Sequence, residues 1–147
     1  MYLGSGTKSL NTTDAYNTIG SLLSADAFAA VMGSYTYVAA NRFEYDVHDR
    51  IICSDIALNA SYSFGNEQNN SINDYQGVLT HELGHTWGLC DVYESSNQFS
   101  VSNVNELPTM FGGVNYSGYS GNISILLRDL RQADINGLNV VKGLRGF

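Results

Sequence analysis

The feature that most constrains the fold of this chain is the sequence THELGHTWGLCD at residues 80–91. Apolar residues recur near the 3.6-residue period of a helix from Asp74 onward, and this pattern ends at Gly88. His81 and His85 are four positions apart, so on a helix their imidazoles lie one above the other on the same face. The segment therefore predicts a helix that presents two nitrogen ligands to a single point.

Two histidines with this spacing can both direct a ring nitrogen at one zinc ion about 2.0–2.1 Å away. Glu82 lies one step round the helix, where it can take a proton from a zinc-bound water. A catalytic zinc needs a third protein ligand and one open position. Gly88 has no Cβ, so it can end the helix in a left-handed conformation and turn the chain back toward the metal. We therefore predict three zinc ligands, His81, His85 and Asp91, with Glu82 as the general base.

Two alternatives stay open on the sequence alone. In a thermolysin-like arrangement the third ligand is a glutamate about twenty residues after the second histidine, and Glu106 has nearly that spacing. That arrangement leaves Gly88 without a role and takes its ligand from the loop-like segment SNVNELP. The other alternative is a catalytically silent module that keeps zinc for stability, against which Glu82 argues. His48, in the polar stretch DVHDR, is interpreted as a surface residue.

The rest of the chain mixes strand and helix patterns, which predicts an α+β fold with an α/β-like N-terminal part. Helices are expected at residues 12–32, 74–88 and 124–141. Strands are expected at residues 35–40, 50–59 and 60–64, the second as a buried central strand and the last as an edge strand. Segment 43–47 is expected to be either a continuation of the first strand or its hairpin partner. Residues 92–122 look irregular because Asn, Ser, Gly and Tyr dominate them.

Length and composition indicate one folded domain over residues 1–147, divided into a part up to the histidine helix (1–88) and a part after it (89–147). Apolar residues make up 44% of the chain and charged residues 14%. The net charge is −7, with seven Lys and Arg and no basic run, so neither nucleic acid nor an anionic membrane surface is expected as a partner. Asp26 and two glycines interrupt the apolar region 19–40, so no membrane span is expected. We also expect the protein to be a monomer.

The segment HELGHTWGLCD resembles the extended HExxHxxGxx(H/D) signature of the metzincin zinc endopeptidases. The aspartate at the last position resembles the third ligand of snapalysins, which are small secreted bacterial neutral proteases. SDIALN (54–59) is similar to the strand before the active-site helix of matrixins, and LRQADINGLNVV (130–141) is similar to their C-terminal helix. The sequence PTM ending at Met110 resembles the Met-turn, in which a methionine forms an apolar floor beneath the zinc site.

This resemblance, over roughly residues 51–141, implies a metzincin-like fold: a small twisted mixed sheet packed on the active-site helix, then an irregular part ending in a helix. It implies hydrolysis of peptide bonds in protein or peptide substrates by one catalytic zinc ion. Secretion is expected from the resemblance and from the polar uncharged composition, although residues 1–10 show no signal peptide. One departure is Gly112, because several metzincins have a tyrosine two residues after the methionine.

The substrate is expected to lie extended along the edge strand at 60–64, which makes Ala60, Tyr62 and Phe64 candidate binding residues. Segment 111–119 is expected to wall the adjacent pocket, with Tyr116 and Tyr119 as candidates to reach the site.

The sequence leaves two further features undecided. The polar loop 65–74 is a candidate calcium site, but its carboxylates, Glu67 and Asp74, are too few and too scattered to support one. Cys53 and Cys90 permit either one disulfide or two thiols, and spacing alone does not decide between them.

Overall fold

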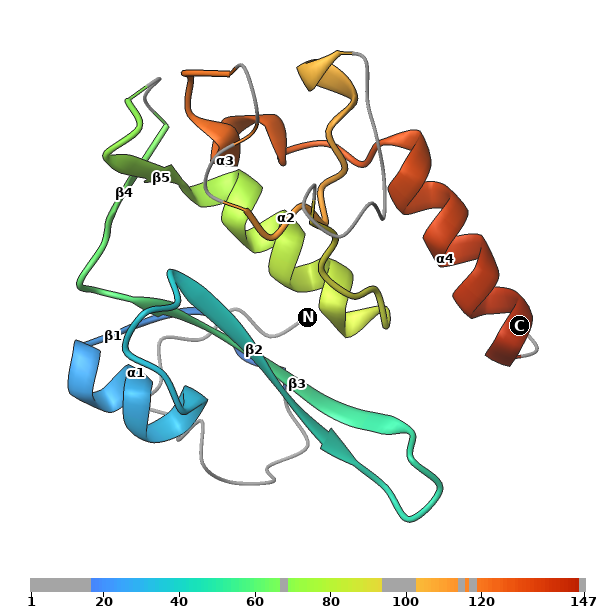
Figure 1. The fold of residues 1–147 in the computed structure, drawn as a ribbon. Helices are drawn as coiled ribbons and strands as arrows, with labels where there is room; N and C mark the ends of the chain where they lie inside the picture. Colours follow the sequence, from blue (N-terminus) through green and yellow to red (C-terminus); the bar gives the residue numbers. More distant parts are fainter. Residues whose placement is uncertain (1–16, 67–68, 94–102, 114–115, 117–118, 146–147) are drawn as a thin grey trace.

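The computed structural model describes residues 17–66, 69–93, 103–113, 116 and 119–145, which form an α+β fold (Figure 1). Its centre is a three-stranded mixed sheet of β1 (Ile19–Leu23), β2 (Ala39–Tyr45) and β3 (Ile51–Asn59). The strand order is β1-β3-β2, with β1 parallel and β2 antiparallel to β3. Strand β3 is buried from Cys53 to Asn59, as its apolar sequence predicts for a central strand.

Helices cover both faces of this sheet. Helix α1 (Ala25–Met32) packs Phe28 against Ala57 of β3. Helix α2 (Tyr75–Thr86) packs Val78 against Leu58, the next residue of β3. Because successive strand residues point to opposite faces, α1 and α2 lie on opposite sides of the sheet. The histidine-bearing helix α2 is therefore supported by the sheet.

The N-terminal half corrects two expectations about secondary structure. The helix expected at 12–32 is wrong over residues 19–23, which form β1 and pair with β3, and α1 begins only at residue 25; residues 12–16 lie outside the described part of the chain. The apolar residues there satisfy a helical spacing locally, but parallel pairing with β3 overrides it. The strand expected at 35–40 begins only at residue 39, and segment 43–47 is its continuation up to residue 45, so the two form one strand, β2, antiparallel to β3.

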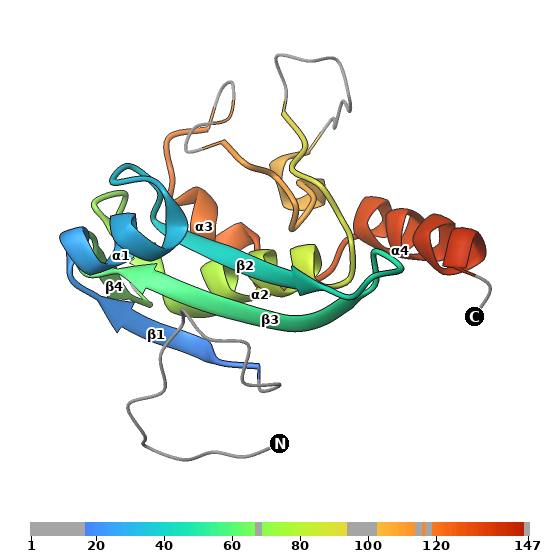
Figure 2. The same ribbon diagram turned by 90° about the horizontal axis from the view of Figure 1, so that it is seen from below.

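The edge strand expected at 60–64 is also wrong. The chain turns out of the sheet after Asn59, where the Tyr62 N–H donates to the Asn59 carbonyl. It then forms β4 (Ser63–Gly65), which pairs in parallel with β5 (Ile72–Asp74) in a separate two-stranded sheet just before α2. Strand β2 is therefore the edge of the main sheet nearest α2, as Figure 2 shows from a second side.

Between α2 and residue 122 the described residues are mostly irregular, as expected, with a short 3-10 helix η2 (Val104–Glu106). The single helix expected at 124–141 is two helices, α3 (Ile123–Leu126) and α4 (Gln132–Arg145). The Asp134 carboxylate accepts a hydrogen bond from the Arg131 N–H and so starts α4 anew. A second core holds Leu107, Phe111, Ile123 and Leu127. None of the helices in the described part of the chain has the length and apolar character that a membrane crossing requires.

Candidate metal centre

Helix α2 is fixed at both ends by features that do not involve its histidines. At its start, the Asp74 carboxylate accepts a hydrogen bond from the Gly77 N–H and a two-pronged ion pair from Arg128, at 2.9 and 2.5 Å. At its end, Gly88 has a φ of 89°, the left-handed conformation that the sequence predicts for the turn. The chain therefore reverses and brings Asp91 back beside the helix.

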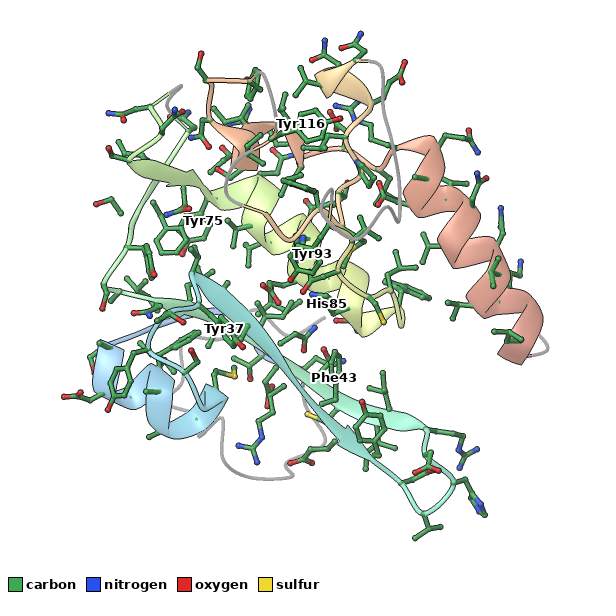
Figure 3. All side chains as sticks on the ribbon, in the orientation of Figure 1. Tyr37, Phe43, Tyr75, His85, Tyr93 and Tyr116 are labelled. Carbon is green, nitrogen blue, oxygen red and sulfur yellow. The ribbon has the colours of Figure 1, made fainter. Side chains whose placement is uncertain are left out.

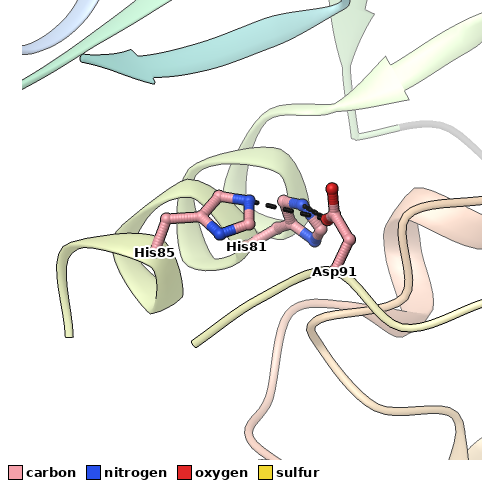
Figure 4. Close-up of side chains that lie close together, drawn as sticks. All are labelled: His81, His85 and Asp91. Atoms are coloured by element: carbon pink, nitrogen blue, oxygen red, sulfur yellow. Dashed lines mark ion pairs between the residues drawn. The ribbon is translucent and has the colours of Figure 1, made fainter. Parts of the chain in front are cut away.

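The side chains of His81, His85 and Asp91 converge on one point (Figure 4). Asp91 Oδ1 lies 3.0 Å from His81 Nε2 and 3.5 Å from His85 Nε2. Ligands placed tetrahedrally about 2.0–2.1 Å from a zinc ion are separated by about 3.3–3.4 Å. The observed separations therefore suit a single ion held by two imidazole nitrogens and one carboxylate oxygen.

The other ring nitrogen of each histidine is engaged by the backbone. His81 Nδ1 lies 2.8 Å from the Thr109 carbonyl oxygen, and His85 Nδ1 lies 2.8 Å from the Leu89 carbonyl oxygen. A carbonyl only accepts, so each Nδ1 must carry the hydrogen. In the neutral ring this leaves the Nε2 lone pair directed at Asp91. Histidines that bind metals have this second hydrogen bond almost invariably.

The charge balance of the group also fits a cation. Asp91 Oδ1 is buried and has no hydrogen-bond partner. Burial raises the pKa of Asp91, but the facing imidazoles of His81 and His85 outweigh it and hold that pKa far below its ordinary value. Burial lowers the pKa of His85, yet the Asp91 carboxylate raises it overall. Both shifts mean that this point favours positive charge, which a proton or a metal ion can supply.

Glu82 lies on the same turn of α2 and is 7% exposed. Burial raises its pKa, an effect that the nearby His81 and His85 rings oppose and the charge of Asp91 reinforces. It lines the same cleft as the three convergent side chains. A carboxyl group beside a metal position with a raised pKa is suited to both accepting and returning a proton.

Met110 packs against α2 at Gly84, the residue before His85. A Cβ added at Gly84 would lie 2.1 Å from Met110 Sδ, so glycine is required for this contact. Asp134 of α4 accepts hydrogen bonds from the backbone N–H groups of Thr109 and Met110, at 2.9 and 3.2 Å. Because Thr109 also supplies the carbonyl that orients His81, one short segment connects α4 to the candidate site.

A cleft of about 850 Å³ runs past the convergent side chains, between β2 and the segment after α2. Figure 3 shows Phe43 of β2, and Tyr37 just before that strand, on one side of it, with His85 and Tyr93 across from them. Its far wall is apolar and includes Phe111, Ile123 and Leu127.

Of the residues expected to bind substrate, Tyr62 lines the cleft, whereas Ala60 and Phe64 do not. Ala60 is exposed where the chain leaves the sheet, and Phe64 packs edge-on against Tyr75. Tyr116 and Tyr119 pack on the second core, behind the wall formed by Phe111.

Tyr93 is a site residue that the sequence reasoning missed. Its hydroxyl donates to Asp91 Oδ2 at 3.2 Å, and a Cβ at Gly112 would lie 2.7 Å from the same hydroxyl. The sequence feature that predicts this contact is the two-residue spacing between Asp91 and Tyr93, because in an extended segment residues two apart point the same way. The segment is extended here, since Val92 forms a bridge with Phe111.

The remaining candidates lie away from this centre. Glu106 is exposed in η2, and within the described part of the chain His81, His85 and Asp91 are the one group of three with the arrangement of a metal site. His48 is exposed in the β2–β3 turn, as expected. Cys53 is buried and Cys90 is exposed, and no disulfide joins them.

The loop considered for calcium is held by other means. Asp74 is engaged by Arg128 and Gly77, and Asn122 donates hydrogen bonds to the carbonyls of Asn69 and Ile72. Glu67 lies outside the described residues.

Comparisons with models of known protein families, with curated protein sequences and with solved structures found no match to this chain.

Proposed function

We propose that this chain is a zinc-dependent endopeptidase of the metzincin kind, with His81, His85 and Asp91 as zinc ligands. The observation that carries the proposal is the convergence of two Nε2 atoms and Asp91 Oδ1 at 3.0–3.5 Å, with each Nδ1 hydrogen-bonded to a carbonyl. Three protein ligands leave a fourth position free, and Glu82 lies beside them, which is the arrangement of catalytic zinc sites.

When bound, the zinc ion would lower the pKa of a water and polarise the peptide carbonyl. Glu82 accepts the proton of that water on its carboxylate and then returns it to the departing amine. Its burial keeps bulk water away and raises its pKa, so the protonated form is accessible for the second transfer. No described strand pairs with the outer edge of β2, so this edge can pair with an extended substrate, and the apolar residues Phe111, Ile123 and Leu127 of the cleft can accept a side chain.

The fold supports the same proposal. A mixed sheet packs on α2, Gly88 ends that helix with a reversal, Met110 lies beneath it, and α4 closes the chain with Asp134 bonded to the methionine segment. We infer a metzincin-like architecture from this combination. On the resemblance of the sequence we also propose that the substrates are proteins or peptides and that the enzyme is a secreted monomer.

The thermolysin-like alternative is disfavoured because Glu106 is exposed in η2 and outside the convergent group. Zinc content separates the two ligand sets, since Asp91→Ala should empty the site and Glu106→Ala should leave it filled.

The experiment that tests the function is cleavage of casein by zinc-loaded protein, its Glu82→Gln variant and a chelated control. Loss of a general base typically costs about 10²–10⁴-fold in rate, so we expect Glu82→Gln to bind zinc normally and to lose that much activity. A wild type that binds zinc at this site and cleaves neither casein nor unstructured peptides would contradict the proposal and favour the silent zinc module.

A further inference from the structure

One side chain connects β2, which borders the cleft, to helix α2 at the level of the candidate base. Asn41 lies on β2, and its amide reaches across to α2. Its Nδ2 donates to the Glu82 carbonyl oxygen at 2.8 Å and to Thr86 Oγ1 at 2.8 Å. The strand that borders the cleft is therefore bonded to the turn of helix that carries Glu82.

The orientation of this amide is fixed from behind. The Ser54 hydroxyl of β3, which is buried, donates to Asn41 Oδ1 at 2.8 Å. Ser54 Oγ also lies 2.8 Å from Thr86 Oγ1. The Ser54 hydroxyl has one hydrogen and gives it to Asn41, so the Thr86 hydroxyl donates to Ser54. Asn41, Ser54 and Thr86 therefore form a closed set of hydrogen bonds, in which each hydroxyl donates once. In this set the Asn41 Nδ2 donates only to α2.

The bond to the Glu82 carbonyl is additional to the helix. A backbone carbonyl has two lone pairs, and the helical hydrogen bond uses one of them. Within the described residues, no strand pairs with the outer edge of β2, so its backbone groups face the cleft. A substrate paired with that edge is placed relative to Glu82 through Asn41. An error of about 1 Å in such placement can cost about 10²-fold in rate.

We propose that Asn41 is a positioning residue that holds the substrate-binding edge of β2 in register with Glu82. This inference rests on the endopeptidase function proposed above. Asn41 touches neither the zinc ligands' metal-facing atoms nor the attacking water. It acts on substrates that pair with β2 and leaves the metal site itself unchanged.

The test compares two substrates that share one scissile bond. One is a blocked dipeptide amide, and the other is a peptide long enough to pair along the seven residues of β2. In Asn41→Ala and Asn41→Asp, kcat on the long peptide should fall by about 10- to 100-fold. Zinc affinity, and kcat/KM on the dipeptide amide, should change by no more than about twofold. Asn41→Asp keeps the acceptor for Ser54, loses the donor to α2 and places a carboxylate oxygen against the Glu82 carbonyl.

A matched control is Asn73→Ala, because Asn73 also lines the cleft but its amide donates to the Ser63 carbonyl at 3.4 Å. This control should leave the ratio between the two substrates unchanged.

Equal losses on both substrates, or loss of zinc by both Asn41 variants, would overturn the proposal, because they would assign Asn41 to folding alone. An unchanged ratio in an active enzyme would overturn it too. A zinc-loaded wild type that cleaves neither substrate would instead contradict the endopeptidase function.

Discussion

Tyr93 is the residue whose contribution is least visible in the sequence, because it reaches the candidate ligands through Asp91. Its hydroxyl holds the carboxylate oxygen that does not face the histidines. Removing a hydrogen bond to a metal ligand typically costs about 10- to 100-fold in metal affinity or activity. We therefore expect Tyr93→Phe to weaken zinc binding by about tenfold, measured by competition with a chromogenic chelator. Tyr35→Phe, on an exposed tyrosine, is the control, and equal affinities in the two variants would contradict this role.

At the scale of residues, the sequence predicts what is local. Three site residues, His81, Glu82 and His85, lie within one and a half turns of helix. Gly88 can adopt a left-handed conformation because it has no Cβ. The geometry of these four residues therefore follows from the local sequence. Tyr93 and Asn41 were missed because their contacts depend on segments that meet only in the folded chain.

The close approach of α2 to the methionine segment leads to a prediction about Gly84. In Gly84→Ala the new Cβ meets the buried Met110 sulfur, so the methionine must repack. Overpacking of this kind costs about 1–3 kcal/mol, which exceeds the gain of up to about 1 kcal/mol from replacing a helical glycine. Gly143→Ala in α4 is the control, because its Cβ meets nothing within 4 Å. Urea unfolding should show a less stable Gly84→Ala and an unchanged or slightly more stable Gly143→Ala; equal stabilities would contradict the contact.

The start of α2 gives a prediction about pH. Burial raises the pKa of Asp74, but the hydrogen bonds from Arg128 and the Gly77 N–H outweigh it and hold that pKa below its ordinary value of 3.8. The ionised carboxylate therefore stabilises the fold above that value, and this contribution is lost as the pH falls through 3.8 toward the folded pKa.

In zinc-free protein, Asp74→Asn should lower the free energy of unfolding by about 1–3 kcal/mol near neutral pH. The difference from wild type should shrink below about pH 4. Urea titrations between these conditions measure it, and a gap that is constant with pH would show that Asp74 acts without its charge.

At the scale of elements, the sequence predicts α2 and β3 well and β1 badly. Strand β3 carries an apolar run long enough to identify a buried strand by itself. Residues 19–23 are short and satisfy a helical spacing, and only their parallel pairing with β3 makes them a strand. Residues 60–64 alternate aromatic and small polar side chains, which predicts an edge strand. The chain turns out of the main sheet after Asn59, however, so β2 forms the edge of that sheet.

For the molecule as a whole, zinc should contribute to stability because the three ligands come from two segments that meet only in the fold. A ligand present at 100 times its dissociation constant stabilises by about 2.7 kcal/mol. For a domain of this size that corresponds to a fall in Tm of roughly 5–10 °C when a chelator removes the ion. Differential scanning calorimetry with and without chelator measures this fall, and Asp91→Ala should not show it. An identical Tm for loaded and chelated wild type would contradict a site that exists only in the folded state.

The most direct measurement is a crystal structure with an anomalous-scattering map recorded at the zinc edge. The account predicts one peak within about 2.0–2.2 Å of His81 Nε2, His85 Nε2 and an Asp91 oxygen, with a solvent molecule in the fourth position close to Glu82. A peak bound by four protein atoms, or an Asp91 carboxylate turned away from the ion, would contradict it.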